Sequence, residues 1–150
     1  KGAGNFSIEQ SEDIVAIEAL IKQNHGGKRI LVVEDEPINR EITLMILDDI
    51  ALQVDVAEDG LDAIDKVNQT RYELILMDMQ MPRMNGLDAT RQIRKLPNGQ
   101  QVPILAMTAN AFVEDKVRCF DAGMDDFLTK PVEPESLFSK LLKWLSVQRS

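Results

Sequence analysis

The stretch Ile30-Leu31-Val32-Val33-Glu34-Asp35-Glu36 is a short apolar run that ends in three consecutive acids. Uninterrupted apolar residues over this length indicate a strand buried on both faces, as in the centre of a parallel sheet. Two similar runs follow, Leu74-Ile75-Leu76-Met77 and Ile104-Leu105-Ala106-Met107. A polar residue follows each run, so these three strands predict both the centre of a sheet and the edge where its chemistry lies.

Two weaker strands and five helical segments surround these runs. Val54 and Val56 alternate with polar residues, as is typical of an edge strand, and Phe127-Leu128 predicts the opposite edge. Apolar residues at helical spacing fill the segments between the strands. They are Ile38, Ile42, Met45 and Ile46; Leu61, Ile64 and Val67; Leu87, Thr90 and Ile93; Val113, Val117 and Phe120; and Leu137, Leu141, Trp144 and Leu145. The alternation predicts an α/β fold, a parallel sheet covered by helices on both faces.

The composition is that of a globular domain with an acidic surface. The chain has 150 residues, of which 44% are hydrophobic and 28% charged, and its formal net charge is −8. This charge argues against nucleic acid as a direct partner, because phosphate binding needs a basic surface. No apolar stretch approaches the length of a membrane span, and the single Cys119 allows no intrachain disulfide. We therefore expect a cytoplasmic segment that makes no membrane contact of its own.

The chain divides near Gly26-Gly27 into two unequal parts. Residues 1–27 are mostly polar, with one apolar-periodic stretch from Ile14 to Ile21 that Ser11 could cap, so we interpret them as a linker or appendage with a short helix. Residues 28–150 hold all the predicted strands and form the main domain. Because the chain begins without a methionine, we expect it to be part of a longer protein.

Polar side chains follow four of the five predicted strands. Glu34 and Asp35 follow the first strand, Asp78 the third, Thr108 the fourth and Lys130 the fifth. The carboxyl ends of parallel strands meet at one edge of a sheet, so we expect these side chains to share one site. Carboxylates held close together repel one another and favour a hard divalent cation with oxygen ligands, of which Mg²⁺ is the best match.

This set of side chains suits the transfer of a phosphoryl group to a carboxylate. The charge of Asp78 would be screened by a cation bound to Asp35, to Asp78 itself and to the backbone carbonyl of Gln80, so that an anionic donor can approach. The ammonium of Lys130 can pair with one phosphoryl oxygen, and the hydroxyl of Thr108 can donate to another. Because a carboxylate nucleophile can form an acyl phosphate, we predict Asp78 as the phosphoacceptor.

Five short motifs follow the predicted strands in order. They are Val32-Val33-Glu34-Asp35-Glu36-Pro37, Leu76-Met77-Asp78-Met79-Gln80-Met81-Pro82, Met84-Asn85-Gly86, Met107-Thr108-Ala109 and Lys130-Pro131. In this order they resemble the response-regulator receiver family, over roughly residues 28–148. The resemblance implies a flavodoxin-like, doubly wound five-stranded sheet of order 2-1-3-4-5. It also implies a phosphohistidine donor, carried by a sensor histidine kinase or a histidine phosphotransfer protein.

The resemblance also implies a role for each matching residue. The matches are Asp78 to the phosphoacceptor, Glu34 and Asp35 to the metal-site acids, Thr108 to the switch hydroxyl and Lys130 to the lysine of the site. Phe127 matches an aromatic switch position, and the Lys130-Pro131 bond is cis in the family. Two positions depart from the common pattern. Glu34 stands where aspartate is frequent and would reach a metal by a longer path, and Phe127 lacks the hydroxyl of tyrosine.

The motif around Asp78, with Met84-Asn85-Gly86, also resembles receivers attached to hybrid sensor histidine kinases. This implies a relay domain within a larger kinase, through which it could be tethered to a membrane. We expect a signalling module and not an enzyme. Phosphorylation would repack the face made by the fourth helix, the fifth strand and the fifth helix of the main domain and so change partner affinity. The stimulus, the cognate kinase, the output and the oligomeric state follow from none of these residues.

Two other functions stay open at this point. Phosphatases of the haloacid dehalogenase class also use an aspartate after a strand, but they need a second acid two residues later, where this chain has Gln80. An interaction domain that works without phosphorylation would keep the fold alone, and the intact set of acid, hydroxyl and lysine argues against it.

Some of these residues also have purely structural interpretations. Glu36 can cap the following helix, with Pro37 in its first turn. Met79, Met81 and Met84 are expected to pack, because thioethers suit soft metals and not Mg²⁺. The only histidine, His25, is interpreted as a linker residue.

Overall fold

The computed structural model describes residues 3–81, 84–109 and 113–147, with side chains at residues 14–81, 84–109 and 114–147. Five strands form one sheet: β1 (Arg29–Val33), β2 (Gln53–Ala57), β3 (Leu74–Asp78), β4 (Ile104–Thr108) and β5 (Asp126–Thr129). The helices are α1 (Ala3–His25), α2 (Pro37–Leu47), α3 (Gly60–Gln69), α4 (Gly86–Ile93), α5 (Val113–Ala122) and α6 (Pro134–Leu145), with short 3₁₀ helices η1 (Asp48–Ile50) and η2 (Pro97–Gly99). All strand pairs are parallel, in the order β2-β1-β3-β4-β5. The predicted fold and strand order are thus confirmed, and α1 precedes the five helices that alternate with the strands.

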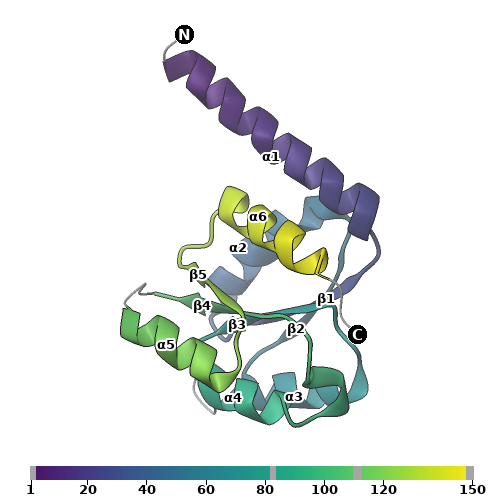
Figure 1. Ribbon diagram of the computed structural model, residues 1–150, viewed down its shortest axis with the longest axis vertical. Helices are drawn as coiled ribbons and strands as arrows, with labels where there is room; N and C mark the ends of the chain where they lie inside the picture. Colours follow the sequence, from purple (N-terminus) through teal and green to yellow (C-terminus); the bar gives the residue numbers. More distant parts are fainter. Residues whose placement is uncertain (1–2, 82–83, 110–112, 148–150) are drawn as a thin grey trace.

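The sheet is the middle layer of three (Figure 1), with α2 and α6 on one face and α3, α4 and α5 on the other. Side chains of the central strands alternate between two hydrophobic cores. The core beneath α3, α4 and α5 contains Leu31, Val33, Ile75, Met77, Ile104 and Ala106. The core beneath α2 and α6 contains Ile30, Val32, Leu74, Leu76, Leu105 and Met107. Because both faces of each central strand are buried, these strands read as continuous apolar runs.

Three helices that border the carboxyl edge of the sheet begin with a side-chain cap, among them α2 and α4. The Glu36 carboxylate accepts hydrogen bonds from the backbone N–H groups of Ile38 (2.9 Å) and Asn39 (3.0 Å) at the start of α2, which confirms its predicted capping role. Asn85 begins α4 in the same way and accepts from the N–H of Asp88 at 2.9 Å. These caps satisfy N–H groups that a helix leaves unpaired and fix the loops leading out of β1 and β3.

The helix before the first strand is longer than the sequence suggests. α1 begins at Ala3, well before Ser11, and runs for 23 residues, so the expected short helix capped by Ser11 was wrong. Figure 1 shows its first turns extending away from the rest of the fold. Within the described ranges, no helix combines the length and the apolar character that a membrane span requires.

The last turns of α1 belong to the core beneath α2 and α6. Ile21 is fully buried there, together with Leu141 and Leu145 of α6. His25 is also buried: its Nδ1 accepts a hydrogen bond from Lys28 Nζ at 2.9 Å, and its Nε2 lies 3.1 Å from Ser146 Oγ. His25 is therefore a packed residue and not a linker residue. The division of the chain between residues 27 and 28 stays a prediction.

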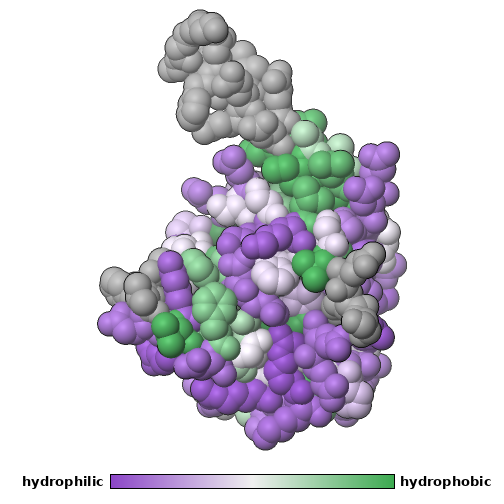
Figure 2. Space-filling view, viewed as in Figure 1, coloured by the Kyte–Doolittle hydropathy of each residue, from purple (hydrophilic) through white to green (hydrophobic). Residues whose placement is uncertain are grey.

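Large apolar side chains are exposed on several helices, including α1 and α2. Figure 2 shows an apolar area over the described part of α1, where Val15 and Leu20 are exposed. On α2, the exposed fractions are 68% for Ile38, 43% for Ile42 and 70% for Met45, whereas Thr43 and Leu47 face the core. The apolar spacing therefore predicted helix α2 correctly, but much of its apolar surface faces away from the sheet.

Candidate functional site

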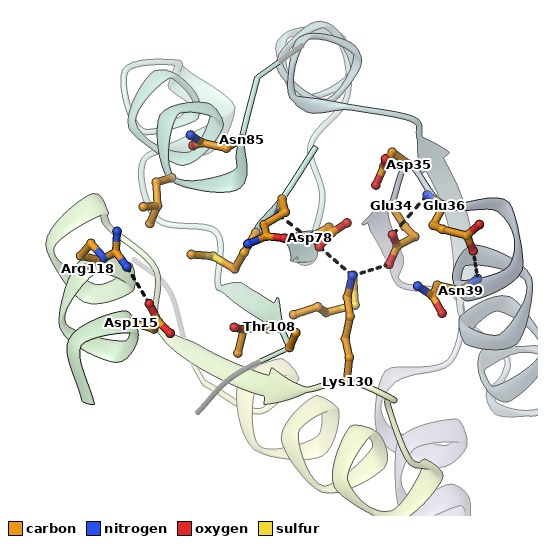
Figure 3. A pocket seen from close by; sticks show the side chains of 15 residues that line it. Glu34, Asp35, Glu36, Asn39, Asp78, Asn85, Thr108, Asp115, Arg118 and Lys130 are labelled. Atoms are coloured by element: carbon orange, nitrogen blue, oxygen red, sulfur yellow. Dashed lines mark hydrogen bonds and ion pairs between the residues drawn. The ribbon is translucent and has the colours of Figure 1, made fainter. Parts of the chain in front are cut away.

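A cleft of about 580 Å³ lies at the carboxyl edge of the sheet (Figure 3). Its walls come from the ends of β3 and β4, from the segments after β1 and β5, and from α2, α4 and α5. The lining residues are Glu34, Asp35, Glu36, Asn39, Asp78, Met79, Gln80, Asn85, Leu87, Met107, Thr108, Ala109, Asp115, Arg118 and Lys130. The structure thus brings together, in one cleft, the acids, hydroxyl and lysine that the sequence places after four strands.

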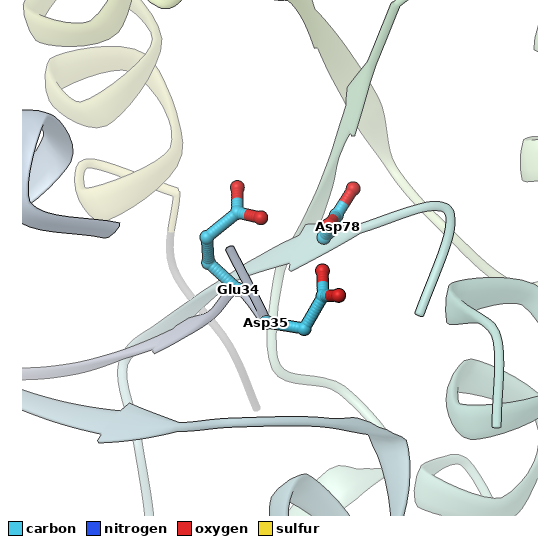
Figure 4. Close-up of side chains that lie close together, drawn as sticks. All are labelled: Glu34, Asp35 and Asp78. Carbon is cyan, nitrogen blue, oxygen red and sulfur yellow. The ribbon is translucent and has the colours of Figure 1, made fainter. Parts of the chain in front are cut away.

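Three carboxylates form the floor of the cleft. Glu34, Asp35 and Asp78 each offer an oxygen, and these atoms lie within 4.8 Å of one another (Figure 4). Glu34 is 1% exposed and Asp78 is 2% exposed, whereas Asp35 is partly exposed. The Glu34 N–H donates to the carbonyl of Ala57 at 3.1 Å, so the pairing of β1 with β2 fixes the backbone that carries this acid.

Lys130 bridges two of the carboxylates. Its Nζ donates a hydrogen bond of 2.7 Å to Oδ1 of Asp78 and lies 3.3 Å from Oε1 of Glu34. The Lys130 N–H donates to the carbonyl of Thr108 at 2.8 Å, which ties the segment after β5 to the end of β4. The Lys130-Pro131 bond is cis, as the resemblance implies.

The close packing of these charges shifts their pKa values. Burial raises the pKa of Glu34 to about 7, and hydrogen bonding and repulsion from Asp78 add to the shift, while Lys130 opposes it. The same causes, burial first and then Asp78, raise the pKa of Asp35. Burial alone would lower the pKa of Lys130. Hydrogen bonds and attraction from Asp78 and Glu34 outweigh burial and raise it, so the ammonium stays charged.

The remaining predicted site residues occupy different positions. Thr108 ends β4, lines the cleft and is 8% exposed. Gln80 also lines the cleft, and its N–H lies 3.4 Å from Oδ1 of Asp78; a metal ligand role for its carbonyl stays a prediction. Phe127 is not among the described lining residues. Its ring packs on the core below, with Lys116 Nζ 4.5 Å and Lys140 Nζ 5.1 Å from the ring centroid, and its switch role stays a prediction.

Four polar lining residues were not predicted from the sequence: Asn39, Asn85, Asp115 and Arg118. Asn85 belongs to a quoted motif, and its cap at α4 gives it a local reason to be there. Asp115 and Arg118 form an ion pair one turn apart on α5, a pattern that in sequence indicates only an exposed helix face. No local signal could have placed these two residues at the cleft. By contrast, Met81 is buried and Met79 and Met84 pack against the core, which confirms the expected packing of the methionines.

The donor set in the cleft fits a divalent cation. Three carboxylates and one ammonium leave an excess of negative charge, and carboxylate oxygens are the ligands that Mg²⁺ prefers. Glu34, Asp35 and Asp78 are the residues that would hold the ion. The carboxylates come from two adjacent strands, β1 and β3, at the point where the strand order reverses, where open α/β sheets form their sites.

The fold and the site together define a flavodoxin-like α/β domain with a carboxylate–lysine site at its topological switch point. Comparison with protein families makes this assignment specific. The chain belongs to the response regulator receiver domain family, whose model matches residues 30–142. The family match thus agrees with the five sequence motifs and with the residues that line the cleft.

The relatives of this chain include sensor kinases much longer than it is. It is 38% identical over 115 residues to the signal transduction histidine-protein kinase BarA of Escherichia coli, covering 77% of this chain and 12% of that protein. It is 40% identical over 119 residues to the sensor protein GacS of Pseudomonas syringae, covering 77% of this chain and 13% of that protein. The chain therefore spans about an eighth of the length of these relatives.

Solved structures show the same fold. The receiver domain of the sensor histidine kinase PA1611 from Pseudomonas aeruginosa, with a magnesium ion coordinated in its active site cleft, is 39% identical. It has a TM-score of 0.76, with 81% of this chain and all of that one covered. The receiver domain of Ssk1 from Saccharomyces cerevisiae, in a co-crystal with the histidine phosphotransfer protein Ypd1, is 31% identical with a TM-score of 0.74. That match covers 79% of this chain and 89% of the other.

Proposed function

We propose that this chain accepts a phosphoryl group on Asp78 from a phosphohistidine donor and acts as a relay and switch domain, not as an enzyme with turnover. One observation carries the proposal: Lys130 Nζ lies 2.7 Å from Asp78 Oδ1, at the bottom of an acidic cleft. A donor can reach the Asp78 carboxylate through the cleft. The Lys130 ammonium already lies where the negative charge of a phosphoryl group would develop.

The reaction follows from the atoms in the cleft. A carboxylate oxygen of Asp78 forms a bond to phosphorus while the phosphorus–nitrogen bond of the donor breaks, and the departing imidazole takes up a proton. The result is an acyl phosphate, one of the covalent intermediates that carboxylates form. When bound to Glu34, Asp35 and Asp78, Mg²⁺ supplies charge neutralisation for the incoming phosphoryl oxygens. The residues of this chain supply position and further charge, which phosphoryl transfer needs most.

The new phosphoryl group would change the contacts of Lys130 and Thr108. The Lys130 ammonium, now on the bare carboxylate, can follow the charge to a phosphoryl oxygen. The Thr108 hydroxyl at the end of β4 can donate to another oxygen. Thr108 ends β4 and Lys130 directly follows β5, on the side of the domain that carries α5 and α6. Movement of these two side chains would favour an alternative packing of α5, β5 and α6, and Phe127 would change its rotamer in the process.

The exposed apolar side of α2 is the surface that we propose for docking the donor. Glu36 and Asn39, at the first turn of α2, line the cleft, and Ile38, Ile42 and Met45 stand exposed along the same helix. A donor protein that packs on these side chains would bring its histidine to the mouth of the cleft. The complex of the Ssk1 receiver with Ypd1 supports a partner of this class.

The similarity to BarA and GacS supports a place in a hybrid sensor histidine kinase, with the donor on the same chain or on a separate phosphotransfer protein. In that setting the domain passes on a phosphoryl group and has no small substrate to turn over. Its expected lack of contact with nucleic acid stays a prediction, supported by the net charge of −8.

Transfer from radiolabelled phospho-Ypd1 tests both the proposed reaction and the docking surface. We expect label to move to this chain in the presence of Mg²⁺ and none to appear on Asp78→Asn. Met45→Ser should slow transfer from phospho-Ypd1 while leaving labelling by acetyl phosphate unchanged. Leu61→Ser, at an exposed apolar residue of α3, is the matched control. Equal losses from Met45→Ser and Leu61→Ser would contradict the docking surface. Label on Asp78→Asn would contradict the reaction.

A further inference from the structure

Negative charges outnumber positive charges in the lining of the cleft, and the positive charges lie at two separate places. Five lining residues are acids, namely Glu34, Asp35, Glu36, Asp78 and Asp115. Among the described lining residues, only Lys130 and Arg118 carry a positive charge. Lys130 is already held at the floor, between Asp78 and Glu34. An anionic donor that enters the cleft therefore meets mostly carboxylates, and Arg118 is the cation that it can meet first.

Arg118 stands on the wall opposite the acids that follow β1 (Figure 3). Its guanidinium donates to Oδ1 of Asp115 at 2.7 Å, and both residues lie on α5. The Arg118 side chain is 64% exposed, while that of Asp115 is 23% exposed. An exposed pair of this kind contributes little to stability, so holding α5 together does not explain it. The pair holds the Arg118 guanidinium at the rim of an acidic cleft. The guanidinium keeps N–H donors that its bond to Asp115 does not use.

We propose that Arg118 is a phosphodonor-binding residue, which pairs with phosphoryl oxygens of the incoming donor, and that Asp115 restrains it. The inference rests on the proposed function, because it concerns the donor for Asp78. The planar guanidinium suits a phosphoryl group, to which it can donate two parallel hydrogen bonds. Asp115 competes for the same donors and also adds one more negative charge to the wall. The two residues of the pair are therefore expected to affect the reaction in opposite directions.

This arrangement has a matched control elsewhere in the chain. Arg91 and Asp88 on α4 form the same kind of pair, three residues apart, at 2.8 Å, and both are exposed. Neither of these residues is among the described residues that line the cleft. Substitutions of Arg91 and Asp88 change the net charge of the protein by the same amount as those of Arg118 and Asp115. They also remove the same kind of ion pair from a helix. A general effect of charge or of helix stability would thus appear at both pairs.

The test is the second-order rate constant for phosphorylation of the whole 150-residue chain by acetyl phosphate and by phosphoramidate, with saturating Mg²⁺. We expect Arg118→Ala to lower the rate constant for acetyl phosphate by about fivefold, the size typical of a single charge at a solvated site. The fall should be smaller for phosphoramidate, which carries less negative charge. Arg118→Lys should restore part of the rate, and Asp115→Asn should raise the rate above that of the unmodified chain.

Two further measurements separate binding of the donor from a structural role. The deficit of Arg118→Ala should shrink as ionic strength rises, because salt screens an exposed charge. The Mg²⁺ affinity of Arg118→Ala, measured by calorimetry, should differ from that of the unmodified chain by less than about twofold. The exposed Arg118 guanidinium interacts only weakly, through water, with an ion at the floor of the cleft. Arg91→Ala and Asp88→Asn should leave all of these quantities unchanged.

The outcomes distinguish this inference from the function on which it rests. If the unmodified chain is not labelled by either donor, the proposed function fails. If it is labelled, and Arg118→Ala reacts as fast as the unmodified chain or no slower than Arg91→Ala, the role of Arg118 is overturned while that of Asp78 stands. A deficit that is equal for both small donors and insensitive to salt also overturns it, because the effect would then come from the shape of α5.

Discussion

Lys130, directly after β5, donates a 2.7 Å hydrogen bond to Asp78 at the end of β3. These two strands are separated in the sheet by β4. The bond places a charged ammonium against a carboxylate that is almost fully buried. The same ammonium partly offsets the charge of Glu34. The cleft is therefore a set of mutually dependent charges, in which removing one member changes the pKa and the free energy of the others.

Replacing Lys130 tests that dependence. Lys130→Ala leaves Asp78 and Glu34 without their cation, and we expect the free energy of unfolding at pH 8 without metal to fall by about 2 kcal/mol. Mg²⁺ should reduce the loss, because a divalent cation offsets the same carboxylates. Urea unfolding with and without Mg²⁺ measures both effects, and Lys95→Ala, at an exposed lysine, is the control. Unchanged stability in the metal-free protein would show that the bridge is not a stabilising contact.

Glu34 should make stability depend on pH. Its pKa is raised from 4.5 to about 7 in the folded state, so the folded protein holds this proton more tightly than the unfolded chain does. The resulting stabilisation is complete below pH 4.5 and is lost as the pH rises through about 7. Relative to Glu34→Gln, the metal-free protein should lose roughly 3 kcal/mol of unfolding free energy between these limits. Parallel profiles for the two proteins would contradict the raised pKa.

Gly86 should be intolerant of any side chain. A Cβ atom at this position would collide with the backbone carbonyl of Asp78, and it would also approach Met77. We expect Gly86→Ala to cost about 2 kcal/mol or more and to slow phosphorylation, because relief of the clash moves the acceptor. Gly27→Ala is the control: its positive φ of 86° makes alanine strained, but nothing lies within 4 Å. It should lower stability and leave the rate of phosphorylation intact.

The acid cluster should bind Mg²⁺ through Asp35. Asp35→Asn removes a charged, partly exposed ligand of the cleft, and we expect the Mg²⁺ dissociation constant to rise by about tenfold or more. Isothermal calorimetry measures this constant directly. Asp65→Asn, at an exposed acid of α3, should have no effect. Equal affinities for the two variants would show that the ion, if bound, sits elsewhere.

The sheet and most of the site could be predicted because each depends on local sequence. Runs such as Leu74–Met77 are apolar over their whole length since both faces of the strand are buried, and parallel strands bring Asp35, Asp78 and Lys130 to one edge whatever the loops do. The cap formed by Glu36 is local as well, because donor and acceptor lie within one turn.

The features that sequence did not predict depend on contacts between distant segments. The length of α1 was missed because its residues before Ser11 carry no strong helical pattern, and the burial of His25 depends on α6, at the other end of the chain. Apolar spacing on α2 could not show which residues face solvent, since the exposed Ile38 is the same residue type as the buried Ile30. Arg118 lines the cleft because α5 packs against α4 and β5, which no local pattern reveals.

Intact-mass measurement after treatment with acetyl phosphate tests the central claim most directly. In the presence of Mg²⁺ we expect the mass of the chain to rise by one phosphoryl group, with the modified residue mapped to Asp78 by peptide sequencing. Without Mg²⁺, or in Asp78→Asn, the adduct should be absent. The same adduct on Asp78→Asn, or a modified residue outside the cleft, would contradict the account.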